Sequence, residues 1–403
     1  CRGSAMRRCS TSRKASLPLI DCSPASCMAE RPHILHVHGS FTLGGKEART
    51  VRLMNIWGDR ARHSVMSADP DALGARAAID PAVEVAFPDG PSFAGKPGLA
   101  RYKVITAFLK TFDLVLTYNW GSIDAVMAHR LAGASAGLPP LIHHEDGFNA
   151  DEIVRLKTKR NLFRRVALQR AHALVVPSVR LEGIARNVWK QPAGKINLIR
   201  NGVDIPRYAD APAPDGIPGL RRSRGKLLVG TLAGLRAVKN IPRLVRAVAA
   251  HKDRLQLVVV GEGPERDAIL AEAAQYGLDD ICMAGFMDRP WRFVGLFDIF
   301  ALSSDSEQFP ISLVEAMAAG VPVASMDVGD VINMVAPENR PYIVADDAGL
   351  ADALGMLASD PDLRARLGEA NRLLAARDYA ENAMVDAYAA LYGEALASPM
   401  ILR

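Results

Sequence analysis

Short apolar runs alternate with amphipathic segments from His33 to the end of the chain. The apolar runs, such as HILHVHG, FDLVLTYN and LQLVVVGEG, are rich in valine, leucine and isoleucine, which is typical of strands buried on both faces. The segments between them, such as SIDAVMAHRLAG, place apolar residues at helical spacing. This alternation predicts an α/β protein with doubly wound parallel sheets, covered by helices on both faces.

The alternation stops between Ile205 and Gly225, where the chain carries four prolines and three glycines. This composition is typical of an interdomain linker. We therefore expect two Rossmann-like domains, residues 30–204 and 226–378, that face each other across a cleft at the carboxyl ends of their strands. We expect the last segment, residues 379–403, to form a helix that packs back toward the N-terminal domain.

Residues 1–29 hold most of the net charge of the chain. They contribute +4 of the total +5, so the remaining residues are close to neutral and give no argument for nucleic-acid binding. The segment lacks the apolar stretch of a signal peptide, and we expect it to be disordered or to precede the true start, with Met28 as the candidate initiator. Cys282 is the only cysteine beyond it, which fits a reducing, cytoplasmic location.

The loop HGSFTLGGKEAR, residues 38–49, resembles a phosphate-binding loop only in part. Lys46 is displaced by one position, and Glu47 occupies the place of the hydroxyl that would bind Mg²⁺. The dinucleotide fingerprint is also missing after the first strand. A nucleoside triphosphatase and a hydride-transfer enzyme are therefore disfavoured. Gly44 and Gly45 keep two interpretations: an anion site made of backbone N–H groups, or a tight turn that needs a positive φ.

Two glutamates, Glu307 and Glu315, flank Pro310 in the stretch SSDSEQFPISLVEAMAAGVP, residues 303–322. Pro310 suits the first turn of a helix, which we expect to end at Gly320. Glu307 then lies in the loop before the helix, and Glu315 lies roughly 8 Å along the helix axis. The free N–H groups at the helix start suit a diphosphate. The alternative is that Glu307 only interacts with the helix dipole and Glu315 is solvated.

The block DIFALSSDSEQFPISLVEAMAAGVPVASMDVGD, residues 298–330, resembles the E-x7-E region of glycosyltransferase family 4. Four further pieces extend the resemblance over residues 32–377: LGGKEAR, NGVD, GLRAVKN and VVGEGPER. The resemblance implies the GT-B fold and a retaining, metal-independent transfer from a nucleotide-sugar donor, with no cofactor besides this co-substrate. Asp-Pro-Asp tripeptides at residues 69–71 and 360–362 lie in turn-like contexts, so we expect no metal site.

The same resemblance implies roles for individual residues. Glu307 would contact the hydroxyls of the donor sugar, Lys239 would neutralise the leaving diphosphate, and Glu315 would bind the ribose. His143 or His144 would lie near the donor sugar, although a histidine at a strand end is also commonly structural. The other expected donor-side residues are Gly44, Gly45, Gly234, Arg236, Gly285, Phe286, Gln308, Phe309, Pro310 and Ile311.

Three positions keep two interpretations each. The family often has an arginine where Gly234 stands, and Arg236 either substitutes for that arginine or is a surface residue. Asn119 and Trp120 either line the acceptor side or close a strand.

Seven basic residues between Arg155 and Arg170 lie in a segment, residues 151–173, with helical spacing. Such a helix suits peripheral contact with anionic lipid headgroups, or it is a solvated face. The resemblance implies a saccharide or lipid-linked saccharide acceptor, polysaccharide biosynthesis and work at the inner face of the cytoplasmic membrane. Two alternatives stay open: a nucleotide-sugar epimerase of the same fold, and a non-catalytic protein that binds a nucleotide sugar.

Overall fold

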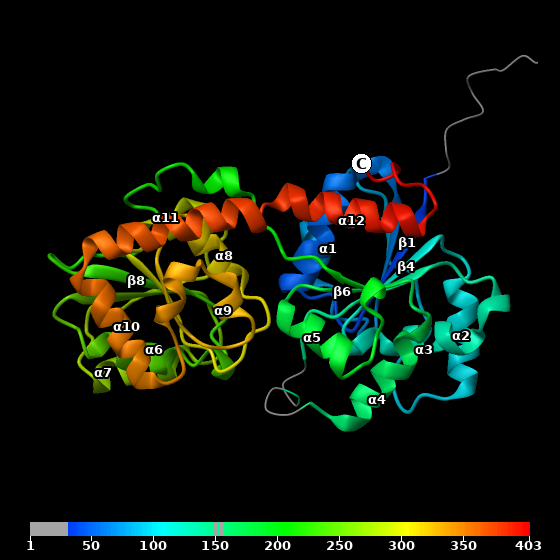
Figure 1. Cartoon of the computed structure of the whole chain (residues 1–403), viewed down its shortest axis with the longest axis horizontal. Coiled ribbons are helices and arrows are strands. Elements are labelled where there is room, and N and C mark those ends of the chain that lie inside the picture. Colours follow the sequence, from blue (N-terminus) through cyan, green and yellow to red (C-terminus); the bar gives the residue numbers. More distant parts are fainter. Residues whose placement is uncertain (1–30, 149–151, 153–155) are drawn as a thin grey trace, which may run out of the picture. The chain divides into compact units, whose positions relative to one another are not determined.

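The computed structural model describes residues 31–148, 152 and 156–403 (Figure 1). The expectation about residues 1–29 lies outside these ranges, as does part of the segment 149–155. The residues from Pro32 to Arg403 form one compact unit. Within the described ranges, no helix combines the length and the apolar character that a membrane span requires.

The N-terminal domain contains a seven-stranded parallel sheet with the strand order β3-β2-β1-β4-β5-β6-β7. The central strands are fully or almost fully buried, as their continuous apolar runs predict. In register, Leu35 of β1 lies opposite Val115 of β4, and Leu116 of β4 lies opposite Ile142 of β5. The strands are β1 (His33–His38), β2 (Arg62–Ser67), β3 (Val85–Ala86), β4 (Leu114–Tyr118), β5 (Leu141–His144), β6 (Ala173–Val176) and β7 (Ile196–Leu198).

The C-terminal domain contains a six-stranded parallel sheet with the order β10-β9-β8-β11-β12-β13. The sheet is wound outward from β8 in both directions, so β8 and β11 are neighbours although β9 and β10 lie between them in sequence. The two sheets confirm the predicted α/β GT-B fold class. The strands are β8 (Leu227–Leu232), β9 (Leu255–Val260), β10 (Cys282–Gly285), β11 (Ile299–Leu302), β12 (Val323–Met326) and β13 (Ile343–Val344).

Helices follow most strands of both sheets. In the N-terminal domain they are α1 (Gly45–Trp57), α2 (Leu99–Leu109), α3 (Ile123–Ala132), α4 (Thr158–Ala167) and α5 (Val179–Asn187). The later helices are α6 (Ile241–Ala249), α7 (Arg266–Gln275), α8 (Ile311–Ala318), α9 (Val331–Met334), α10 (Asp347–Ser359), α11 (Pro361–Asp378) and α12 (Glu381–Ala395). The helix expected over residues 151–173 is shorter than predicted, because the chain turns through a short 3-10 segment, Leu168–Arg170, to enter β6.

Helix α8 has the boundaries that its sequence predicts. Pro310 precedes its first residue with a φ of −69°, and the helix ends at Ala318. Gly320 follows with a φ of +72°, the left-handed conformation that commonly terminates a helix. Leu313 and Met317 are fully buried in the core of the C-terminal domain, so α8 is fixed against its sheet.

Helix α12 packs against the N-terminal sheet (Figure 1). Its Tyr388 and Tyr392 side chains are buried in one cluster with Ile34 and Leu116 of the sheet and Trp57 of α1. The rings of Trp57 and Tyr392 lie 5.6 Å apart. A helix from the end of the chain therefore completes the core of the N-terminal domain.

Candidate functional site

Lys239 and Glu307 lie on two loops that the C-terminal sheet brings together. One loop follows β8 and the other follows β11, its neighbour in the sheet. Lys239 Nζ donates to Glu307 Oε1 at 2.5 Å, and Ser304 Oγ donates to the same oxygen at 2.7 Å. The Lys239 and Glu307 side chains are only 17% and 10% exposed. The ammonium group and the carboxylate thus form one ion pair.

Hydrogen bonds hold these two loops against each other. The Asp305 N–H donates to the Val238 carbonyl at 2.9 Å, and Ser303 Oγ donates to the Lys239 carbonyl at 3.0 Å. Asn240 adopts a φ of +43°, and its side chain caps α6 by accepting a backbone N–H of the first turn. The turn that carries Lys239 is therefore constrained on both sides.

The start of α8 lies beside the loop that follows β5. A methyl group at Gly147 would come within 2.7 Å of the Gln308 side chain, so the two loops are in direct contact. Among the residues that the structure describes, no side chain caps α8. An uncapped helix start offers N–H groups and a positive dipole end to an anion. Phe309 is 9% exposed and packs on Tyr379 in the core, so only its backbone is placed to take part.

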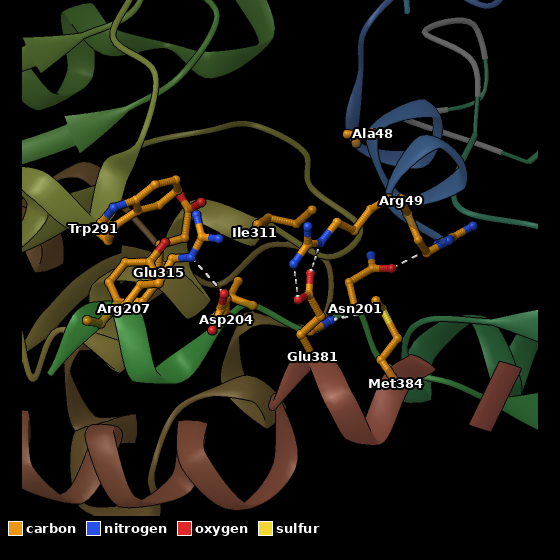
Figure 2. A pocket seen from close by; sticks show the side chains of 15 residues that line it. Ala48, Arg49, Asn201, Asp204, Arg207, Trp291, Ile311, Glu315, Glu381 and Met384 are labelled. Carbon is orange, nitrogen blue, oxygen red and sulfur yellow. Dashed lines mark hydrogen bonds and ion pairs between the residues drawn. The ribbon is translucent and has the colours of Figure 1, made fainter. Parts of the chain in front are cut away.

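A cavity of about 390 Å³ contains Glu315. Figure 2 shows Glu315 beside Trp291 and Arg207, across the cavity from Arg49 and Asn201. The other lining residues are Gly45, Ala48, Arg52, Gly202, Val203, Asp204, Tyr208, Ile311, Glu381 and Met384. Of the residues expected from the sequence, the cavity therefore includes Gly45, Ile311 and Glu315. The Lys239–Glu307 pair does not line it.

The electrostatic environment of Glu315 is unusual for a carboxyl group. Burial raises its pKa to about 7, and a hydrogen bond with Tyr208 opposes the shift. Burial and the nearby Glu315 also raise the pKa of Tyr208. Glu315 is therefore a mixture of protonated and ionised forms near neutral pH, and a partner that donates hydrogen bonds would shift it to the ionised form.

Arg49 has no counterpart among the sequence-based candidates, yet it joins three segments. Its guanidinium donates to both carboxylate oxygens of Asp146, at 2.5 and 2.8 Å, and to Asn201 Oδ1 at 2.8 Å. Burial alone would raise the pKa of Asp146, but Arg49 outweighs burial and lowers it. Arg49 lies in LGGKEAR and Asn201 lies in NGVD, two pieces of sequence that resemble the family. This resemblance could have identified both residues as candidates. The contacts of Arg49 with Asp146 and with Asn201 form only in the folded chain.

Gly44 and Gly45 form the start of α1. Gly44 has an extended backbone, with a φ of −143°, so the alternative of a turn that needs a positive φ is wrong for this residue. A methyl group at Gly45 would lie 3.8 Å from Ile311 of α8. The starts of α1 and α8 thus approach each other at the cavity.

His143 and His144 are fully buried in the sheet and are not among the residues that line the cavity of Glu315. The His143 ring contacts Thr117 Oγ1 at 2.8 Å. His144 Nδ1 donates to the Thr117 carbonyl, its Nε2 accepts from the Tyr392 hydroxyl at 2.7 Å, and burial lowers its pKa to about 3. These contacts favour the structural alternative for both histidines, because other groups of the protein form hydrogen bonds with both rings.

Asn119 and Trp120 have different surroundings. Asn119 Oδ1 accepts the Asp146 N–H at 2.6 Å, so its side chain connects the loop after β4 with the loop after β5. Trp120 lines a second cavity in the N-terminal domain.

The loops after β8 and β10 carry the remaining expected residues. Gly285 has a φ of +75°, and its carbonyl accepts the Gly261 N–H at 2.8 Å. Phe286 is 70% exposed. Gly234 and Arg236 are also exposed, and in the described part of the chain the Arg236 guanidinium makes no hydrogen bond or ion pair. These loops therefore present an unpaired cation and an exposed aromatic ring.

Within the described ranges, no three His, Cys, Asp or Glu side chains are grouped as a metal site requires. The two Asp-Pro-Asp tripeptides have local roles. Asp360 caps α11 by accepting the Leu363 N–H at 2.8 Å, and Asp69 accepts the Asp71 N–H at 3.3 Å in a turn.

Residues 218–374 match the family model described as Glycosyl transferases group 1, and this span contains Lys239, Glu307 and Glu315. EpsF of Bacillus subtilis (strain 168), a protein named as a glycosyltransferase, is 31% identical over 51% of this chain and 58% of its own length. An N-acetyl-alpha-D-glucosaminyl L-malate synthase of Bacillus anthracis is 28% identical over 41% of this chain and 45% of its own length. The chain thus spans about half the length of the curated relatives it matches.

The structure is also similar to that of Anabaena Alr3699/HepE in complex with UDP. The TM-score is 0.71 at 20% sequence identity, and the match covers 90% of this chain and 100% of that chain. This similarity extends over both domains and establishes the shared GT-B fold.

Proposed function

We propose that this protein is a glycosyltransferase that moves a sugar from a nucleoside-diphosphate donor to a hydroxyl group of a saccharide or lipid-linked saccharide. The observation that carries the proposal is the Lys239–Glu307 pair on the loops beside the uncapped start of α8. A cation and a helix N-terminus suit a diphosphate, and a neighbouring carboxylate suits the hydroxyls of a sugar. The family match over residues 218–374 supports the same activity.

In the proposed reaction, the bond between the anomeric carbon and the diphosphate oxygen breaks, and its electron pair stays on the diphosphate. The acceptor oxygen bonds to the anomeric carbon and releases its proton to an oxygen of the leaving diphosphate. Lys239 and the N–H groups of α8 would stabilise the charge on the leaving diphosphate. In the empty protein Lys239 contacts Glu307. When Lys239 pairs with the diphosphate instead, Glu307 would be able to orient the sugar. Glu315 would accept hydrogen bonds from the ribose.

On the basis of the family resemblance, we also propose that the transfer retains the configuration of the anomeric carbon and needs no metal ion. The cation and helix start named above would supply the charge stabilisation that a metal ion provides in other transferases. The UDP in the Anabaena structure makes UDP-sugars the first donors to test. A thermal-shift comparison of UDP-, GDP-, ADP- and dTDP-sugars identifies the donor, because a ligand raises the apparent stability of the protein that binds it.

Two substitutions test the proposed site. Lys239→Ala and Glu307→Gln are each expected to lower kcat about 10²–10³-fold, the usual effect of removing one group that stabilises transition-state charge. Lys252→Ala, which removes an exposed lysine next to α6, is the matched control and should keep full activity. Circular dichroism of each variant should match that of the parent protein.

Full activity in both Lys239→Ala and Glu315→Ala would overturn the proposal. Conversion of the donor with no acceptor present would indicate an epimerase instead. Donor binding without turnover against a broad acceptor panel would indicate a non-catalytic nucleotide-sugar binder.

We further propose that the protein works at the inner face of the cytoplasmic membrane, with α4 in peripheral contact with anionic lipid. Leu162 and Val166 of α4 are 62% and 36% exposed, and Lys159 and Arg165 are exposed beside them. Exposed apolar and basic side chains on one helix are typical of interfacial binding.

A further inference from the structure

The second cavity, of about 420 Å³, lies wholly within the N-terminal domain. Its walls come from the loop before α2, from the first turn of α3 and from α4. Its lining includes the side chains of Phe93, Trp120, Asp124, Lys159, Arg160 and Phe163. None of them takes part in the donor-side chemistry proposed above.

A contact between two loops connects the second cavity with the donor side. Trp120 and Gly121 follow β4, and Gly39 follows β1, the neighbouring strand. A methyl group at Gly121 would lie 2.5 Å from Gly39 Cα, so the two loops are in close contact. The loop that starts at Gly39 leads to Gly45, which lines the cavity of Glu315. A single loop therefore links the two cavities at the carboxyl edge of the sheet.

Arg101 fixes one wall of the second cavity. Its guanidinium donates to Asp124 Oδ2 at 2.8 Å, to the Phe93 carbonyl at 3.2 Å and to the Ala94 carbonyl. Arg101 and Asp124 are each only 15% exposed. The loop that carries Phe93 is thus held in place, and the carboxylate of Asp124 is neutralised by its partner.

Aromatic side chains form much of the lining. The Trp120 and Phe163 rings meet edge to face at 5.7 Å, and the Arg160 guanidinium lies 5.0 Å from the Trp120 ring. Phe93, Trp120 and Phe163 are all half-buried, so part of each ring is accessible. Aromatic walls with a few polar groups are typical of ligand cavities of this size, and they suit the C–H faces of a pyranose ring.

The charge around the cavity is positive. Arg160 Nη1 donates a hydrogen bond of 2.9 Å to Glu152 Oε2. Lys159 is exposed and, among the residues that the structure describes, has no hydrogen-bond or ion-pair partner. Arg164 of the same helix, α4, is buried and paired with Glu145, so Lys159 supplies the uncompensated charge of the lining. An anionic group at the mouth of the cavity would therefore meet an uncompensated cation.

We infer that this cavity binds a sugar residue of the acceptor that carries an anionic group, either a carboxylate or a phosphate. The sugar ring lies against the aromatic wall and its anionic group pairs with Lys159. The inference rests on the proposed function, since the bound sugar belongs to the second substrate of that reaction.

Calorimetric titration of the full chain, with UDP present, tests the inference with methyl glucuronide, glucose 1-phosphate and methyl glucoside. At least one anionic probe should bind about tenfold more tightly than the neutral glucoside, the gain expected from one charge-assisted hydrogen bond. Preference for the glucuronide would identify a carboxylate, and preference for the phosphate would identify a phosphate. Lys159→Glu should abolish this preference. Lys103→Glu, an equal charge change on the exposed face of α2 outside the lining, should preserve it.

Equal loss of the preference in both variants would overturn the inference, because it would show a long-range charge effect rather than a site. Failure of both anionic probes to bind would overturn it as well. The thermal shift caused by UDP in the same samples separates this result from failure of the proposed function, because the donor side does not include Lys159.

Discussion

The carboxyl group of Glu315 is buried against Tyr208, and its pKa of about 7 lies well above the ordinary value of 4.5. In the unfolded chain this group loses its proton near pH 4.5, whereas in the folded chain it keeps the proton until about pH 7. Between these values the folded state binds more protons than the unfolded state. Glu315 therefore lowers the stability of the empty protein progressively as the pH rises through this window.

The variant Glu315→Gln cannot ionise and therefore isolates this effect in a comparison with the parent protein. As the pH rises from 4.5 to 7, the free energy of unfolding of the parent should fall relative to the variant by roughly 3 kcal/mol, at about 1.4 kcal/mol per pH unit. Urea unfolding at pH 5, 6 and 7 measures this difference. A constant difference between the two proteins across the window would show that Glu315 does not titrate there.

At the scale of single residues, some contacts of the site can be predicted from the sequence and others cannot. Lys239 and Glu307 lie in recognisable pieces of sequence at the ends of strands, and the carboxyl ends of neighbouring parallel strands meet at one edge of a sheet. The Arg49–Asp146 pair joins residues 97 positions apart, with no local pattern that connects them. His144 likewise accepts a hydrogen bond from a tyrosine 248 positions away.

At the scale of elements, the segment before η9 (Ile205–Tyr208) is joined to the start of α12 by backbone contacts. The Val203 N–H donates to the Tyr379 carbonyl, and the Glu381 N–H donates to the Val203 carbonyl, both at 2.9 Å. Arg52 of α1 also donates two hydrogen bonds of 2.7 Å to the Glu381 carboxylate. These contacts place α12 directly beside the cavity of Glu315.

Gly202 is the position where this junction tolerates no side chain. A methyl group there would lie 2.7 Å from Glu381 Cα and 2.9 Å from the Ala380 carbonyl oxygen, both backbone atoms. Gly202→Ala should therefore lower the free energy of unfolding by about 1–3 kcal/mol, the usual cost of overpacking. Gly183→Ala is the control, because this site within α5 has open space and should gain up to about 1 kcal/mol. Equal stability of the two variants in urea unfolding would contradict the close approach.

At the scale of the whole molecule, positive charge is concentrated on part of the N-terminal domain. Lys103 of α2 and Lys159 and Arg165 of α4 are exposed and, within the described ranges, have no ion-pair partner. The other basic residues of the two helices, Arg101, Arg160 and Arg164, are paired with carboxylates. The chain beyond residue 29 is nevertheless close to neutral. This segregation, together with the exposed Leu162, favours adsorption of one face of the protein to an anionic surface.

Co-sedimentation with vesicles tests this adsorption. Binding is expected to vesicles that contain phosphatidylglycerol, to weaken at high salt and to be lost on vesicles of phosphatidylcholine alone. Leu162→Glu should reduce binding about tenfold or more, because it replaces an inserted apolar group by a charge of the wrong sign. Leu373→Glu, at a 57% exposed site on α11, makes the same change elsewhere and should have little effect. Equal loss in both variants would argue against α4 as the contact.

The sequence by itself determined the local features of this protein. Apolar runs and helical spacing predicted two parallel sheets, Pro310 and Gly320 bounded α8, and the order of the family-like pieces indicated Lys239, Glu307 and Glu315. Only the tertiary structure decided the order of the strands, the burial of both histidines, the contact of Arg49 with Asp146 and the packing of α12 on the N-terminal sheet. The physical reason is that periodicity and turn chemistry depend on neighbours along the chain, whereas the partner of a buried side chain depends on which distant segments pack against it.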